Sequence, residues 1–257
     1  MRSKLKDILL CGVLAVALLP VAAFAKGPLR DFSGVWYSDQ NLNRVSDTAD
    51  DLFQKGEVLD PKAKATAPKL REPYRLKKEK EDALKAEKLK QDKILTDTEI
   101  QCRPDGMPKM MRGILPIEIV QTPKKLVIVA EELSLVRRIF IDKMPPANEI
   151  TPSYAGYSAG HWEGDTLVVN TVQIRPDISF ADIPNTGKSE VDERIRMIDK
   201  DRLEIQFTYK DDLVLEEPYK FTWTYTRHDE HKVMEYVCDN NKYTIGPDGT
   251  VQFNIDD

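Results

Sequence analysis

The stretch of residues 152–171 holds the densest group of side chains that could do acid/base or binding chemistry. It reads PSYAGYSAGHWEGDTLVVNT and brings together Tyr154, Tyr157, Ser158, His161, Trp162, Glu163 and Asp165. Alternate residues of a strand share a face, so His161 would stand beside Glu163 as an acid/base pair. We therefore name His161, Tyr154 and Glu163 as candidate catalytic residues. The alternative is a plain surface hairpin in which Asp165 makes the turn hydrogen bonds.

A second group of side chains suggests binding of a small apolar or aromatic molecule. Arg137 and Arg138 are adjacent on one expected strand, so one of them faces inward and needs an acidic partner or an anionic ligand. Possible acidic partners are Glu118, Glu131, Asp142 and Glu193. With the nearby aromatic residues, the candidate ligand-binding set is Arg137, Arg138, Tyr157, Trp162, Trp223 and Tyr225. Aromatic walls with a few polar groups suit a flat apolar ligand, although the same rings could simply fill a core.

Residues 228–231 read His-Asp-Glu-His, which are metal-ligand types. They lie at an expected hairpin tip, where charged residues are common, and no third ligand is evident. The sequence therefore predicts no metal site, and nothing in it suggests a cofactor.

These candidates need a scaffold, and the composition along the chain predicts one. Residues 31–37 predict a first strand, and residues 60–101 form a charged zone with an exposed helix over 74–95. From residue 102 onward, short alternating strands follow one another, broken by turn residues. The expected strands are 117–122, 126–131, 135–142, 166–174, 192–198, 202–209, 219–228 and 232–238. This pattern predicts a mainly β chain folded as an antiparallel up-and-down barrel with one outer charged helix.

The first expected strand sharpens the choice of barrel. Its Gly34-Val35-Trp36 segment resembles the opening of lipocalins, in which the tryptophan closes one end of the barrel beneath a basic residue from a late strand. Here Arg227, beside Trp223 and Tyr225, is the expected basic residue. The resemblance implies a lipocalin-like barrel.

Residues 1–25 have the pattern of a secretory signal. A basic start is followed by an apolar run over residues 8–24, and Ala23-Phe24-Ala25 is a small-x-small cleavage site. Cys11 lacks the preceding small residue of a lipid-attachment site. We expect a periplasmic or secreted protein, residues 26–257 forming a single domain, with cleavage after Ala25 and no membrane span.

Charge and cysteine content follow from that cleavage. Loss of Arg2, Lys4, Lys6 and Asp7 removes a net +2, so the formal charge changes from -5 to -7. Basic residues of the helical zone are interleaved with acidic ones, which argues against nucleic acid. Cys102 and Cys238 are then the only cysteines, and an even count in an oxidising compartment favours a disulfide over two inert thiols.

Several short motifs recur in one order along the chain. They are DFSGVW (31–36), CRPDGMP (102–108), IVQTP (119–123), RRIFID (137–142), SYAGYSAGHWEGDTLVV (153–169), ERIR (193–196) and EYVCDNN (235–241). In these segments the chain resembles a family of secreted bacterial proteins of unknown function, which implies no particular activity. Family members usually carry an Asp and a His where Asn170 and Lys188 stand here. Neither replacement is a useful acid/base group at neutral pH, so the resemblance implies binding without turnover, or other catalytic residues.

Three functions are consistent with the sequence. The first is a secreted barrel that binds a small apolar or aromatic molecule. The second is a cofactor-free lyase, isomerase or hydrolase acting on such a compound. The third is an envelope interaction protein that docks through its charged helix. A deep cavity containing His161 or Arg138 would favour the first two, and a packed barrel interior would favour the third.

Overall fold

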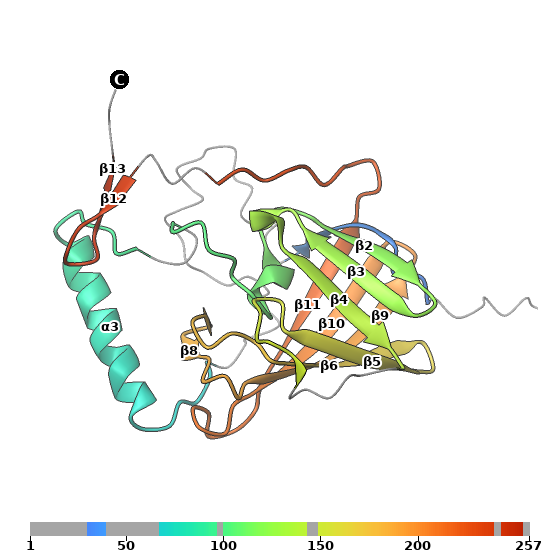
Figure 1. Ribbon diagram of the computed structural model, residues 1–257, viewed down its shortest axis with the longest axis horizontal. Helices are drawn as coiled ribbons and strands as arrows, with labels where there is room; N and C mark the ends of the chain where they lie inside the picture. Colours follow the sequence, from blue (N-terminus) through green and yellow to red (C-terminus); the bar gives the residue numbers. More distant parts are fainter. Residues whose placement is uncertain (1–29, 40–66, 97–99, 143–148, 239–242, 254–257) are drawn as a thin grey trace, which may run out of the picture.

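The computed structural model describes residues 30–39, 67–96, 100–142, 149–238 and 243–253. The expected signal peptide, residues 1–25 with Cys11, lies outside these ranges, as does the 40–66 segment that contains the start of the charged zone. Within the described ranges, the chain folds into a closed β-barrel with one long helix, α3 (Tyr74–Leu89), beside it (Figure 1).

Nine strands close the barrel, in the spatial order β1-β11-β10-β9-β6-β5-β4-β3-β2. Their bounds are β1 Gly34–Ser38, β2 Ile117–Thr122, β3 Lys125–Ala130, β4 Val136–Ile141, β5 Tyr157–Glu163, β6 Thr166–Val172, β9 Glu190–Asp199, β10 Arg202–Lys210 and β11 Tyr219–Arg227. Two small hairpins lie outside the barrel sheet, β7 (Ser179–Phe180) with β8 (Ile183–Pro184) and β12 (Tyr243–Ile245) with β13 (Val251–Phe253). Two short 3-10 helices, η1 (Lys109–Arg112) and η2 (Glu132–Ser134), complete the elements. The predicted mainly β barrel is confirmed.

One strand pair departs from the predicted antiparallel up-and-down order. β4 and β5 run parallel, with Ile139 opposite Ser158 and Ile141 opposite Gly160. Residues 142–156, which connect them, are too many for a tight hairpin and include prolines at 145, 146 and 152. Proline lacks the N–H that a ladder needs, and a parallel pair needs a long connection, so this sequence favours a crossover over a hairpin. The barrel is therefore mixed.

The contact between Trp36 and Arg227, expected from the lipocalin resemblance, is present. Trp36 is fully buried and donates its indole N–H to the Phe32 carbonyl at 2.9 Å. The Arg227 guanidinium lies 4.5 Å from the centre of the Trp36 ring and donates to the Ser33 carbonyl at 2.6 Å. Gly34 sits at φ +138, where a Cβ would lie 2.8 Å from Arg227, so the approach of arginine to tryptophan needs this glycine.

The barrel interior is filled by large side chains around one buried ion pair. Arg137 faces inward and is 1% exposed, and its partner is Glu193, one of the four expected candidates, which is fully buried. Arg137 Nη1 donates to Glu193 Oε1 at 2.9 Å, and Nη2 bonds the other carboxylate oxygen. Two further bonds reach the hydroxyls of Ser158 (3.1 Å) and Thr171 (2.9 Å), so every polar side chain around this ion pair has a partner.

Apolar and aromatic side chains make up the rest of the buried core. Tyr225 is fully buried and donates its hydroxyl to the Met111 carbonyl at 2.8 Å. Phe180 of β7 contacts four barrel rings with centroids 5.0 to 6.4 Å away, Tyr209, Tyr219, Phe221 and Trp223. Phe207 packs against two of these rings, Phe221 at 4.9 Å and Trp223 at 4.6 Å. Burial of this kind is the main favourable term in the fold.

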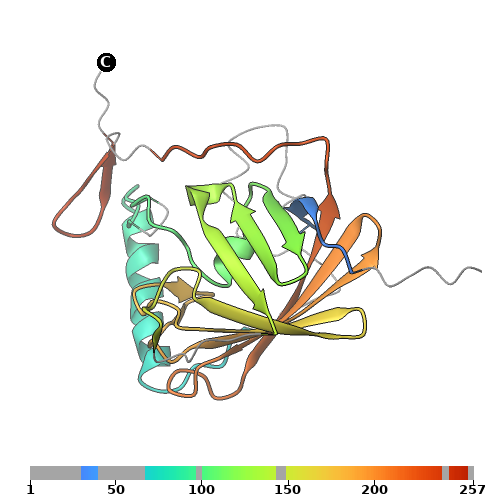
Figure 2. The ribbon, with the colours of Figure 1, turned by 45° about the vertical axis from the view of Figure 1, so that its right-hand side comes forward.

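The helix α3 stands outside the barrel as predicted, but it ends at Leu89 instead of residue 95. Asp92, at φ 55, lies in the left-handed region and stops the helix. Figure 2 shows α3 along one side of the molecule, and it has no buried residue. Lys78 and Lys88 bind Asp182 (2.9 Å) and Asp248 (2.7 Å), which connects the helix to β7–β8 and to the segment between β12 and β13.

The predicted disulfide between Cys102 and Cys238 is present, with a Cα–Cα distance of 5.7 Å. It joins the segment before η1 to the segment after β11 across a sequence separation of 136 residues. A loop of that length is constrained in the unfolded chain by about 5 kcal/mol on the chain-entropy model.

Candidate functional site

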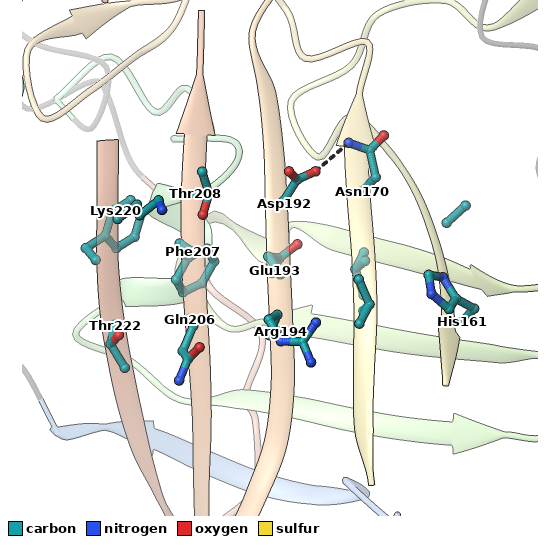
Figure 3. A pocket seen from close by; sticks show the side chains of 14 residues that line it. His161, Asn170, Asp192, Glu193, Arg194, Gln206, Phe207, Thr208, Lys220 and Thr222 are labelled. Carbon is teal, nitrogen blue, oxygen red and sulfur yellow. Dashed lines mark hydrogen bonds between the residues drawn. The ribbon is translucent and has the colours of Figure 1, made fainter. Parts of the chain in front are cut away.

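A groove of about 660 Å³ crosses the outer face of five neighbouring strands, β5, β6, β9, β10 and β11 (Figure 3). Two rows of outward-facing side chains form its walls. Within a row, each residue lies directly opposite the next one on the neighbouring strand. The first row is Ala159, Asn170, Asp192, Thr208 and Lys220. The second row is His161, Val168, Arg194, Gln206 and Thr222.

The floor of the groove is the row of residues between these walls. It consists of Val169, Glu193, Phe207 and Phe221, which are mutually opposed and alternate with the wall residues. Their side chains belong to the barrel interior, where Phe207 stacks on Phe221, so they meet the groove through the backbone. The backbone N–H and C=O groups of a paired strand are already used in the ladder. The floor therefore offers flat, non-bonding contact, and the walls offer the hydrogen-bonding groups.

The strand geometry sets the size of the groove. Alternate residues along a strand are about 7 Å apart, and five adjacent strands span about 19 Å. The groove thus runs across the strands as a trough between two rows of side chains about 7 Å apart. Its volume lies within the usual range for small-molecule sites, roughly 300 to 1,000 Å³.

Polar contacts hold several wall residues in place. Asn170 Nδ2 donates to Asp192 Oδ1 at 2.8 Å, and Lys210 also pairs with Asp192. Arg194 Nη1 donates to Glu163 Oε2 at 3.0 Å, and His161 Nε2 lies 3.3 Å from Glu163 Oε1. The hydrogen bonds from Arg194 and then from His161 lower the pKa of Glu163. Glu163 is therefore a fixed anion at neutral pH that orients two wall residues.

Lys220 is a cationic side chain of the groove wall. It is exposed at the end of the first row, opposite Thr208, and among the described residues it has no ion-pair partner. Arg194 has spare donors as well, because a guanidinium carries five N–H groups. The groove can therefore accept an anionic group without breaking an existing ion pair.

The structure separates the residues that the sequence grouped as a site. His161 lies in the groove wall with Glu163 beside it. Tyr154 precedes β5 and lies under the Arg175 guanidinium, 4.7 Å from the ring centre. Tyr157 stacks on Phe140 at 5.3 Å.

The remaining candidates lie elsewhere on the barrel. Trp162 contacts Phe32 at 5.4 Å near the Trp36 end, and Arg138 is exposed on the outside of β4. Arg137, Trp223 and Tyr225 fill the interior. Of the candidate residues, only His161 lines the groove.

Most residues of the groove were not among the predicted site residues. The signal was present in β9, β10 and β11, where polar residues such as Arg194, Gln206 and Thr222 alternate with buried ones. Alternation shows that these side chains face outward, but only the strand order and register show that they form continuous rows.

Asn170 and Lys188, the two departures from the family pattern, have different surroundings. Asn170 is a wall residue of the groove and bonds Asp192. Lys188 is exposed in the loop before β9, where its backbone N–H donates to Thr186 Oγ1 at 3.3 Å.

Comparison with known proteins finds no matching family model, no matching curated protein and no matching solved structure. The resemblance to a secreted bacterial family therefore stays a prediction. Among the described residues, no helix is long and apolar enough to cross a membrane.

Proposed function

We propose that this chain is a binding protein that holds a small, flat organic acid in the groove across β5, β6, β9, β10 and β11, and that it works in the periplasm or outside the cell. The groove supports this proposal through its shape and through the division of its chemistry between floor and walls. The ligand class is the aromatic one expected from the sequence, with polar groups added at its edge.

The floor favours a ligand with an apolar face. Its peptide groups are paired within the sheet, so a polar ring face laid on it would lose water without gaining hydrogen bonds. The walls favour polar groups at the edge of the same ring, since they offer the hydroxyls of Thr208 and Thr222 and the amides of Asn170 and Gln206. A hydroxylated aromatic acid meets both conditions.

Lys220 is the observation that carries the choice of an acid. It lines the groove without an ion-pair partner among the described residues, and a carboxylate at that end would gain a charge-assisted hydrogen bond. Arg137, the buried cation of the barrel interior, is a poorer candidate because it is already bound to Glu193, Ser158 and Thr171.

A thermal-shift screen with hydroxylated aromatic acids and the matching alcohols tests this proposal. A ligand at 100 times its dissociation constant raises the unfolding free energy by about 2.7 kcal/mol. Lys220→Ala should weaken binding of an acid by roughly 10- to 100-fold, the value of a charge-assisted bond. Lys124→Ala, an exposed lysine at the β2–β3 turn, is the matched control and should leave the affinity unchanged. Acids and alcohols that stabilise equally, or equal effects of the two variants, would contradict the proposal.

His161 favours a second candidate function, a cofactor-free lyase, isomerase or hydrolase. Its imidazole lines the groove and its Nε2 lies 3.3 Å from a Glu163 oxygen, so it could move a proton to or from a bound ligand. Each ligand found in the screen should be followed for product by chromatography. Product that disappears in His161→Ala, while binding persists, would support the enzyme, and a ligand that is always recovered unchanged would support the binding protein.

A further inference from the structure

A turn after β11 brings three metal-ligand side chains together, at a place unrelated to the groove. His228, Glu230 and His231 each offer one ligand atom, and these atoms all lie within 4.8 Å of one another. The His231 N–H donates to the His228 carbonyl at 2.9 Å, which closes the four-residue turn. The sequence alone suggested no third ligand, and the turn supplies one by bringing a Glu230 oxygen close to a nitrogen of each imidazole.

The turn is fixed to the first strand on its other side. The His228 N–H donates to the Val35 carbonyl at 2.8 Å, and Asp229 Oδ1 accepts the Val35 N–H at 3.1 Å. Arg227 binds the other Asp229 oxygen at 3.4 Å. Asp229 is thereby occupied with β1, and the remaining three side chains of the turn are left together and partly exposed.

Tyr37 orients the cluster. Its hydroxyl lies 3.0 Å from His231 Nδ1, and both imidazoles meet its ring edge-on, with centroids 5.2 and 5.3 Å away. When Nδ1 carries the proton and donates it to Tyr37, the lone pair of His231 Nε2 is free and faces Glu230, 4.0 Å away. His228 Nδ1 lies 2.9 Å from the same Glu230 oxygen. Second partners of this kind commonly fix the ring of a metal-binding histidine.

We propose that His228 Nδ1, His231 Nε2 and a Glu230 carboxylate oxygen bind one zinc ion, with Tyr37 as a positioning residue and the fourth position open to water. Two imidazoles and a carboxylate are a zinc donor set. At zinc distances of about 2.0 to 2.2 Å, tetrahedral donors stand about 3.4 Å apart. The ligand atoms here lie within 4.8 Å of one another, and rotation of these partly exposed side chains can bring them to that spacing.

The charge of the cluster favours a cation. Glu230 brings one carboxylate to two imidazoles, and its Oε1 lies 2.9 Å from His228 Nδ1 and 4.0 Å from His231 Nε2. A divalent cation at this point would meet an anionic oxygen and two ring nitrogens, the donor types that zinc takes.

Zinc binding to the full chain should be measured by calorimetry and by metal analysis after dialysis, with zinc chloride as the probe. We expect one equivalent per chain. Glu230→Gln and His231→Ala should each weaken binding at least tenfold, and His161→Ala, the one histidine outside the cluster, should leave zinc affinity unchanged. Tyr37→Phe keeps the ring but removes the bond to His231, and should weaken binding by about 10-fold or more.

Circular dichroism of the metal-free variants shows whether each one folds, so that lost binding reports on the ligands. Imidazole resonances separate the remaining outcomes. Stoichiometric zinc that shifts the His228 and His231 signals together supports the site. No stoichiometric binding, shifts confined to His161, or binding that survives both Glu230→Gln and His231→Ala would overturn it.

Discussion

Replacement of Glu193 by glutamine tests how the barrel interior is held together. Glu193 is fully buried and Arg137 is 1% exposed, so their charges depend on each other and on the hydroxyls of Ser158 and Thr171. Glu193→Gln keeps the shape but places an amide N–H₂ against a guanidinium N–H. An unpaired buried charge of this kind costs about 3 to 5 kcal/mol.

Urea unfolding followed by circular dichroism measures that loss. For a chain of this size, 3 to 5 kcal/mol corresponds to a melting temperature lower by roughly 6 to 20 °C. The double variant Arg137→Met with Glu193→Leu removes both charges and leaves Ser158 and Thr171 bonded to each other at 2.9 Å, so it should lose less than the sum of the single variants. A loss below about 1 kcal/mol in Glu193→Gln, or strict additivity in the cycle, would refute the reasoning.

Three further outcomes follow from the same structure. Burial raises the pKa of Tyr209 from 10.0 to about 12. The stability that its neutral form contributes is therefore complete below pH 10 and is lost as the pH rises toward 12. Spectrophotometric titration should show this tyrosine ionising well above pH 10, and ionisation near pH 10 in the folded protein would contradict the prediction. Replacement of Cys102 and Cys238 by serine should lower the unfolding free energy by up to about 5 kcal/mol. In denaturant, neither of these two cysteines of the wild-type protein should react as a free thiol. Arg227→Ala removes a cation from the Trp36 ring and should cost about 1 to 2 kcal/mol, with a change in tryptophan fluorescence; an unchanged stability and spectrum would argue against the contact.

The elements were predictable where local chemistry decides them. Alternation in segments such as β10 set both the strand and its buried face, and lysine and glutamate at four-residue spacing set α3. The Trp36–Arg227 contact was predictable because it depends on a short motif at the first strand and one late arginine. The parallel pair β4–β5 was not, since the direction in which β5 pairs with β4 is not set by the local sequence of either strand.

The candidate site was harder to predict, for a reason that Arg137 and Arg138 illustrate. Their alternation required that one faces inward, but only the register of β4 against β3 and β5 decides which one. The groove depends on register even more, because Asp192 and Thr208 join one wall only when β9 and β10 align them. His161 could be predicted as a site residue from its imidazole alone, whereas the other wall residues of the groove could not.

The central claim is that a small organic acid binds on the outside of the barrel and not within it. Intermolecular nuclear Overhauser contacts from the tightest ligand test this directly, because both wall rows carry methyl groups: Ala159, Val168, Thr208 and Thr222. The account predicts contacts from the ligand to these methyls, and a perturbed Lys220 ammonium signal. Contacts from the ligand to the buried rings of Trp223 or Tyr225 would place it in the interior and contradict the account.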